Sequence, residues 1–259
     1  MEPFVTSFCA QAIQAYETAN KLLFDDEAER AVHLLSEALK LDPNFVEARI
    51  LAAHAFTATG DHDVAIEHAK HAVWLRGDYA DAKDALFVAY AGKADTAYAE
   101  ERFPDAFDCM ENALLAYPIH ERATDILRYM WFLAERSRRA EKFVVVCQAL
   151  LRSIPDWNEV RYRAGRTLLK LQRFEEAAGF LAEFSRRDER DVDGHLWLGL
   201  AYLALYKWAE AFKEYEIVKA SNSAKAKEVS LIFKAASVMF PNSTQGTLDQ
   251  MLNGFFQRN

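Results

Sequence analysis

The chain has 259 residues, of which 51% are hydrophobic and 27% are charged, and its net charge is −8. This is the composition of an ordinary soluble protein with enough apolar residues for a sizeable core. Only nine Gly and six Pro are present, so little divides the Ala- and Leu-rich sequence into short strands. We therefore expect an all-α protein.

A membrane span and a disulfide framework are not expected from the sequence. The longest strongly apolar run, Leu196 to Tyr206, has 11 residues, well short of the roughly 20 that a spanning helix needs. The N-terminal stretch lacks the basic residues of an export signal. Three widely spaced cysteines without a CxxC pair fit a reducing compartment. The expected location is the cytoplasm.

The charge is divided unevenly along the chain. The residues through Glu135 carry a net charge of −13, whereas the remainder carries +5. Such asymmetry influences partner attraction or head-to-tail self-association rather than the fold.

Small and bulky residues recur in three predicted helices of the N-terminal half. Small residues let paired helices approach, bulky ones fill the gaps, and a proline ends the helix. The residues that carry this pattern are Ala31, Leu35, Ala38 and Pro43, then Ala65, Ala69 and Ala72, then Ala106, Met110, Ala113 and Pro118.

The C-terminal half repeats the same pattern with a fixed period. Residues 161–182 and 195–216 carry the same order of small, bulky and charged positions, offset by 34 residues. The matched pairs are Gly165 with Gly199, Leu168 with Tyr202, Phe174 with Trp208, and Ala177 with Ala211.

This 34-residue period with small residues at set positions resembles the tetratricopeptide repeat (TPR), a unit of two helices, A and B, whose neighbours stack. The resemblance implies a right-handed α-α superhelix, a TPR solenoid of about six repeats over residues 1–225. The remaining residues, 226–259, are expected to form a capping helix and a short amphipathic helix. The repeats lie near 12–45, 46–79, 80–120, 121–157, 158–191 and 192–225; the fourth is degenerate, with Phe143 where Ala is expected and a basic "ERSRRAEK" junction.

The third repeat contains seven extra residues. Seven residues make about two helical turns, so the insertion lengthens helix A without rotating its buried face. The spacing predicts one helix from Ala80 to about Glu101 that tolerates Gly92, with Pro104 in the first turn of the next helix. The overhang is either a tolerated insertion or a docking post for a partner.

Two amphipathic segments follow the last repeat. Residues 227–240 carry Val229, Ile232, Phe233 and Ala236 at helical spacing, which suits a helix that covers the last repeat. After Pro241, Thr247 is a candidate N-cap, and an apolar face follows. That face consists of Leu248, Met251, Leu252, Phe255 and Phe256. It packs either on its own solenoid or on another chain.

The sequence contains no recognisable catalytic constellation. His68 and His71 share a helix face near Glu67 and His62, yet no HExxH motif or second ligand cluster accompanies them. The chain also lacks G-x-S-x-G and a phosphate-binding Gly-rich loop. We expect a non-enzymatic protein without catalytic residues, a metal site or a cofactor.

The family resemblance implies a concave groove, lined by the A helices, as the partner-binding surface. Candidate groove residues are Tyr16, Asn20, Arg122, Tyr129, Tyr162, Arg163, Arg166, Lys170 and Trp197. In the version of the family that clamps chaperone C-termini, Tyr16 here replaces a Lys and Leu51 an Asn, which argues against that ligand. Arg163, Arg166 and Lys170 lie on one face and favour a carboxylate-bearing segment with aromatic or aliphatic anchors. They could equally pair with neighbouring acids such as Glu159 and Asp193.

Three hypotheses follow. The first is an adaptor that binds a peptide or partner protein in the groove. The second is a scaffold that assembles into homo-oligomers through its charge asymmetry or its last helix. The third, nucleic-acid binding through the basic junction, is disfavoured because the chain is acidic overall and no nucleic-acid module is recognised.

Overall fold

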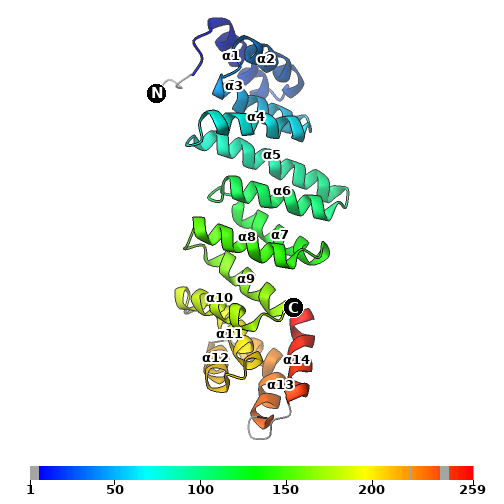
Figure 1. Ribbon diagram of the computed structural model, residues 1–259, viewed down its shortest axis with the longest axis vertical. Helices are drawn as coiled ribbons and strands as arrows, with labels where there is room; N and C mark the ends of the chain where they lie inside the picture. The colour runs from blue at the N-terminus through cyan, green and yellow to red at the C-terminus, as the bar shows by residue number, and fades with distance from the viewer. Residues whose placement is uncertain (1–5, 222, 240–244, 259) are drawn as a thin grey trace. The chain divides into compact units, whose positions relative to one another are not determined.

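The computed structural model describes residues 6–221, 223–239 and 245–258. All regular secondary structure in these residues is helical, in fourteen helices (Figure 1). None of these helices combines the length and apolar character needed to cross a membrane. The chain divides into two compact units, Met1–Arg139 and Ala140–Asn259.

The first unit contains three helical hairpins and one further helix. Within it, α1 pairs with α2, α3 with α4 and α5 with α6, and successive hairpins stack through α2 on α3, α4 on α5 and α6 on α7. Its helices are α1 (Ala10–Phe24), α2 (Ala28–Leu41), α3 (Val46–Ala58), α4 (His62–Leu75), α5 (Ala80–Ala99), α6 (Phe103–Ala116) and α7 (Ala123–Arg136).

The second unit contains two hairpins with one helix before them and two after. Helix α9 pairs with α10 and α11 with α12, α8 packs on α9, and α13 follows α12 in the stack. Its helices are α8 (Ala140–Ser153), α9 (Asn158–Lys170), α10 (Phe174–Arg187), α11 (Val192–Ala204), α12 (Trp208–Ser221), α13 (Ser223–Met239) and α14 (Gln245–Arg258).

Each of the six predicted repeats contains its two helices, and each A helix ends in the same turn. One residue after it has the left-handed backbone conformation, which reverses the chain and leads into helix B. In the fifth repeat, the backbone N–H of Arg173 then donates to the carbonyl of Leu168 at 2.9 Å. The left-handed residues are Asp26, Gly60, Glu101, Arg138, Gln172 and Tyr206. The turn therefore recurs even where no glycine marks it in the sequence.

Helix B ends where the repeat pattern predicts. Helices α2, α6 and α8 end at Leu41, Ala116 and Ser153, just before a proline. Small residues bring the paired helices close: a Cβ on Gly165 of α9 would lie 2.6 Å from Cγ of Leu181 in α10. The all-helical repeat fold predicted from the sequence is confirmed.

The insertion in the third repeat lengthens a single helix. Helix α5 has 20 residues, Ala80–Ala99, and Pro104 lies in the first turn of α6. Gly92 faces the ring of His62, where a Cβ would lie 2.9 Å from Cε1. Beyond this point Thr96 contacts the same ring at 3.0 Å. The absence of a side chain at Gly92 thus lets the extension lie against the start of α4.

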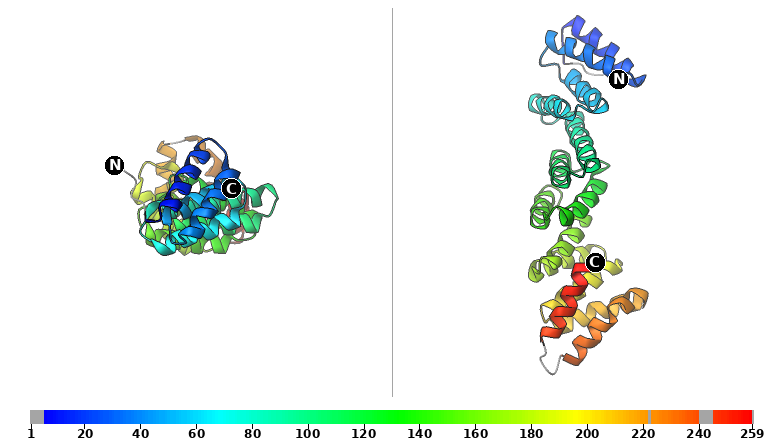
Figure 2. Two further views of the ribbon diagram at one scale, coloured as in Figure 1. Left: turned by 90° about the horizontal axis from the view of Figure 1, so that it is seen from above. Right: turned by 90° about the vertical axis from the view of Figure 1, so that its right-hand side faces the viewer.

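The last two helices belong to the second unit, and they lie side by side (Figures 1 and 2). Val229, Ile232, Phe233 and Ala236 of α13 are buried, as their spacing predicts. Helix α14 includes Gln245, so Thr247 lies inside the helix and its assignment as the N-cap is wrong. The reason is that the helix extends further towards the N-terminus than its apolar face. Helix α14 contacts α9, α11 and α13 of its own unit.

Candidate functional site

The nine candidate groove residues fall into the two units. The first unit contains Tyr16, Asn20, Arg122 and Tyr129, and the second contains Tyr162, Arg163, Arg166, Lys170 and Trp197. They form separate groups, which are described one at a time.

In the second unit, Arg166 of α9 lies between two aromatic rings. Its guanidinium carbon is 4.1 Å from the ring centroid of Trp197 in α11 and 5.6 Å from that of Tyr162. Its Nη1 also donates to the Tyr162 hydroxyl at 3.4 Å. Burial raises the pKa of the Tyr162 hydroxyl above its ordinary value. The structure thus brings together three of the predicted residues as a cation–π cluster.

Arg163 is engaged within its own helix. Its Nε and Nη2 both donate to Oε1 of Glu159, one turn earlier, at 2.8 and 2.6 Å. The Arg163 side chain is only 13% exposed. The pairing with Glu159 that the sequence left open is therefore present, and Arg163 offers less charge to a partner than its position suggested.

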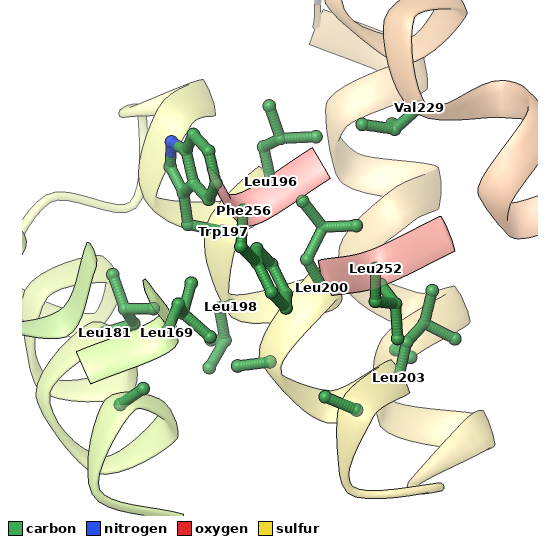
Figure 3. Close-up of a cluster of buried hydrophobic side chains, with 14 of the residues drawn as sticks. Leu169, Leu181, Leu196, Trp197, Leu198, Leu200, Leu203, Val229, Leu252 and Phe256 are labelled. Atoms are coloured by element: carbon green, nitrogen blue, oxygen red, sulfur yellow. The ribbon is translucent and has the colours of Figure 1, made fainter. Parts of the chain in front are cut away.

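Helix α14 covers the side of α11 that the repeat pattern assigns to the groove. The ring of Phe255 lies 5.6 Å from that of Trp197, and Phe256 lies 6.0 Å from Phe174. Leu252 and Phe256 are each 1% exposed, and Trp197 is 6% exposed. Figure 3 shows Leu252 and Phe256 among the leucines of α11 beside Trp197. The last helix therefore packs on its own unit.

Two polar contacts fix the direction of α14 on this face. Near its start, Asp249 accepts a hydrogen bond from the hydroxyl of Tyr206 at 2.8 Å. Near its end, the side-chain amide of Gln257 donates to the backbone carbonyl of Lys170 at 3.1 Å. The carbonyl of Lys170 belongs to the last turn of α9, where helix carbonyls have no partner inside the helix. These contacts align α14 along both A helices of the unit.

In the first unit, Tyr16 and Asn20 of α1 differ in their surroundings. Tyr16 packs against Phe45, with ring centroids 5.1 Å apart, whereas Asn20 is exposed. The pKa of Tyr16 is raised by burial and further by the charge of Glu47. Glu47 itself accepts hydrogen bonds from the backbone N–H and hydroxyl of Thr6, at 3.1 and 2.6 Å. Residues just before α1 thus contact the start of α3 beside Tyr16.

The other two candidates of the first unit line an open hollow of about 290 Å³. Helices α5, α6 and α7 contribute to its wall. Tyr129 is 57% exposed and Tyr98 38% exposed, so two aromatic side chains face solvent there. We call this concavity the α5–α7 hollow. Its lining residues are Asp95, Tyr98, Met110, Arg122, Asp125, Ile126 and Tyr129.

The sequence raised a docking role for the overhang of α5 but named none of its residues as part of a site. Asp95 and Tyr98 lie in the final turns of the lengthened helix. The seven extra residues shift these positions out of the repeat register, so the family pattern assigns them no role. The insertion itself was the signal, because an added length of helix A must contact something beyond the ordinary repeat.

The histidines of α4 contact neighbouring protein side chains. Nδ1 of His68 lies 3.5 Å from Nη1 of Arg49, and its ring stacks on Phe56. His71 contacts Trp74. Within the described residues, no group of three or more His, Cys, Asp or Glu side chains has the arrangement of a metal site.

Comparison with known families identifies the fold. A sequence model of the tetratricopeptide repeat matches residues 16–85 and 162–225, just over half of the chain. The chain belongs to the tetratricopeptide repeat family. No curated protein matches it in sequence.

Several solved TPR structures resemble the chain at low sequence identity. YrrB, described as a TPR protein with an unusual peptide-binding site, is 16% identical; the match covers 76% of this chain and 97% of YrrB, with a TM-score of 0.47. PilF of Pseudomonas aeruginosa is 13% identical over 85% of this chain and 97% of its own, with a TM-score of 0.42. The Thermus thermophilus protein TTC0263 is 20% identical over 74% of this chain and 99% of its own, with a TM-score of 0.35.

TPR repeats generally mediate protein–protein interactions and are typically scaffolds without catalytic activity. In this TPR protein the two groups of candidate residues differ in their exposure to solvent. The A-helix face of α9 and α11 is covered by α14, whereas the α5–α7 hollow leaves two tyrosines exposed.

Proposed function

We propose that this TPR protein is a non-enzymatic scaffold that binds a segment of a partner protein at the α5–α7 hollow. The observation that carries the proposal is the pair of exposed tyrosines, Tyr98 and Tyr129, in one open hollow. Tyrosines give a large contact area at low entropic cost and often dominate interfaces. Isolated exposed aromatics need no explanation, but two in one concavity favour a binding role.

The charges around the hollow indicate what the partner segment carries. Asp95 and Asp125 lie in its wall with Arg122, and the N-terminal half of the chain is strongly acidic. A segment with an aliphatic or aromatic side chain between the tyrosines and a basic residue near the aspartates fits this lining. The acidic surroundings also speed the approach of a basic segment.

The test compares capture of partners by a double variant, Tyr98→Ser with Tyr129→Ser, and by the wild-type protein in extracts of the native host. Captured proteins are quantified by mass spectrometry, and far-UV circular dichroism checks the fold. We expect the double variant to capture at least about tenfold less partner than the wild type, because buried tyrosines are among the few residues that dominate the energy of an interface.

The matched control is Trp74→Ser, which removes an aromatic side chain that is 77% exposed on α4, outside the hollow. It should capture the partner as the wild type does. A photo-crosslinking residue at position 129 should react with the same partner, and one at position 74 should not. Undiminished capture by the double variant would contradict the assignment of the site.

A further inference from the structure

A group of basic side chains without an acidic partner lies where α3 meets α4 in the first unit. Nη1 of Arg49 is 3.5 Å from Nδ1 of His68, and His71 follows His68 by about one turn of α4. Within the described part of the chain Arg49 has no carboxylate partner, because its Nε donates to the carbonyl of Pro43 at 2.8 Å. The residues through Glu135 carry a net charge of −13, so a basic group left without an acid is unexpected here.

The three basic groups make one another's charged forms less favourable. Burial lowers the pKa of Arg49. Burial, followed by the charge of Arg49, lowers the pKa of both His68 and His71. Among the described residues, no carboxylate of α3, α4 or α5 offsets these effects on the two rings. A partly buried charge without a counter-ion is unfavourable, so an anion at this point would supply the missing counter-charge.

Each of the three side chains has a donor left for a ligand. Nη2 of Arg49 has no hydrogen-bond partner in the described part of the chain. His68 accepts from Arg49 at Nδ1, so its neutral ring carries the proton at Nε2. His71 touches the ring of Trp74 by an edge contact, which leaves its ring N–H available. All three side chains are partly exposed, so an anion can reach them from solvent.

The same contacts disfavour a metal ion at these histidines. A histidine binds a metal through a nitrogen lone pair, but Nη1 of Arg49 faces that lone pair on Nδ1 of His68. The guanidinium charge also repels a cation. Both histidines lie on a B helix, outside the groove of the A helices, and neither lines the α5–α7 hollow.

We propose that Arg49, His68 and His71 form a binding site for a phosphate group. A phosphate group offers three acceptor oxygens, one for each side chain, and arginine is well suited to phosphate. Short contacts rather than long-range attraction hold the anion, because the surrounding unit is acidic. This site is independent of the α5–α7 hollow, so the failure of either proposal leaves the other standing.

The first experiment adds inorganic phosphate to the full-length protein at constant ionic strength and follows the histidine ring signals by NMR. The signals of His68 and His71 should shift saturably, whereas that of His33, exposed on α2, should not. Arg49→Gln should weaken the affinity at least about tenfold, because it removes a charged donor. His71→Gln, at a partly exposed position that leaves Arg49 in place, should weaken it at least about threefold.

The matched control is Lys70→Gln, which removes a positive charge from an exposed position of the same helix. It should bind phosphate as the wild type does, and far-UV circular dichroism checks that each variant is folded. The absence of a saturable shift in the wild type would overturn the proposal. Equal weakening by Lys70→Gln and Arg49→Gln would overturn it as well, because it would show a general effect of charge.

The second experiment measures the pH dependence with sulfate, a tetrahedral anion that keeps both charges throughout the range. A bound anion raises the pKa of His68 from its low value of about 4, so binding takes up a proton. The affinity should therefore tighten about tenfold as the pH falls from about 7 to about 5, the linkage of a single proton. His68→Gln should remove most of this change. An affinity of the wild type that is independent of pH would contradict the role of His68.

Two further probes identify the kind of ligand. Phosphoserine with blocked termini should bind at least as tightly as inorganic phosphate when the group belongs to a partner's side chain. Binding of inorganic phosphate alone would support the site with a free phosphate as its ligand. Zinc chloride should cause no saturable shift of the His68 and His71 signals. Zinc binding without phosphate binding would overturn the proposal in favour of a metal site.

Discussion

Gly165 of α9 faces Leu181 of α10 at a distance that leaves no room for a side chain. A Cβ there would lie 2.6 Å from Cγ and 2.9 Å from Cδ2 of the leucine, which is itself fully buried. By contrast, Gly179 on the exposed side of α10 has nothing within 4 Å. The same residue type is therefore required by packing at one position and not at the other.

Gly165→Ala should lower the free energy of unfolding by about 1–3 kcal/mol, because Leu181 or the backbone must shift to admit the methyl group. Gly179→Ala should raise it by up to about 1 kcal/mol through helix propensity. Urea denaturation followed by circular dichroism measures both. Equal effects of the two changes would mean that the close approach of α9 and α10 is not what fixes glycine at position 165.

His68 makes the first unit sensitive to acid. Its pKa is lowered to about 4 by burial and by the nearby charges of Arg49 and His71. The neutral ring accepts from Arg49, whereas the unfolded chain takes up a proton at a pKa of about 6.5. His68 therefore costs the first unit no free energy of unfolding above pH 6.5, and this free energy falls as the pH drops from 6.5 towards 4.

The expected loss attributable to His68 is on the order of 2 kcal/mol, since the ring is partly exposed and solvent screens its charge. His68→Gln should remove most of this pH dependence from the unfolding free energy of the first unit. His33→Gln, at an exposed position of α2, is the control and should retain it. A wild-type profile that coincides with that of His68→Gln would contradict the assignment.

At the scale of elements, α13 closes the end of the repeat stack in the second unit. Phe233 lies on the rings of Tyr215 and Phe212 and reaches Gly199, where a Cβ would be 3.4 Å from its Cζ. Without α13, the last hairpin would expose this apolar face to water. Its neighbour Leu231 is on the opposite side of the helix and 70% exposed.

Phe233→Ala should destabilise the second unit by about 3–5 kcal/mol, the usual cost of emptying a buried phenylalanine site. Leu231→Ala on the same helix should change stability by less than about 0.5 kcal/mol. Thermal or urea unfolding of the two variants makes the comparison. Similar losses from both would indicate that α13 is not anchored through Phe233.

At the scale of the whole molecule, the chain is a repeat protein in two compact units. Repeat proteins are stabilised mainly by contacts between neighbouring repeats, so a local perturbation need not spread. Phe233→Ala should therefore speed amide hydrogen exchange in helices of Ala140–Asn259 and leave Met1–Arg139 unchanged. Exchange that accelerates equally across both units would show that they unfold as one.

Local patterns in the sequence were sufficient to predict most of the helices. The 34-residue spacing of Gly165 and Gly199 identifies the repeat, and the seven-residue insertion predicts α5 nearly to its last residue. These features could be predicted because helix formation and hairpin packing depend on residues close together in the chain.

The state of the candidate sites depended on contacts that no local pattern contains. Lys170 and Gln257 are 87 residues apart, and Tyr206 and Asp249 are 43 apart, yet these pairs place α14 over Trp197. Tyr98 reaches the α5–α7 hollow only because the neighbouring helices stack around it. The sequence alone thus determined the helices and their repeat, whereas the tertiary structure decided which groove-side residues are covered, since long-range packing selects one partner among several compatible faces.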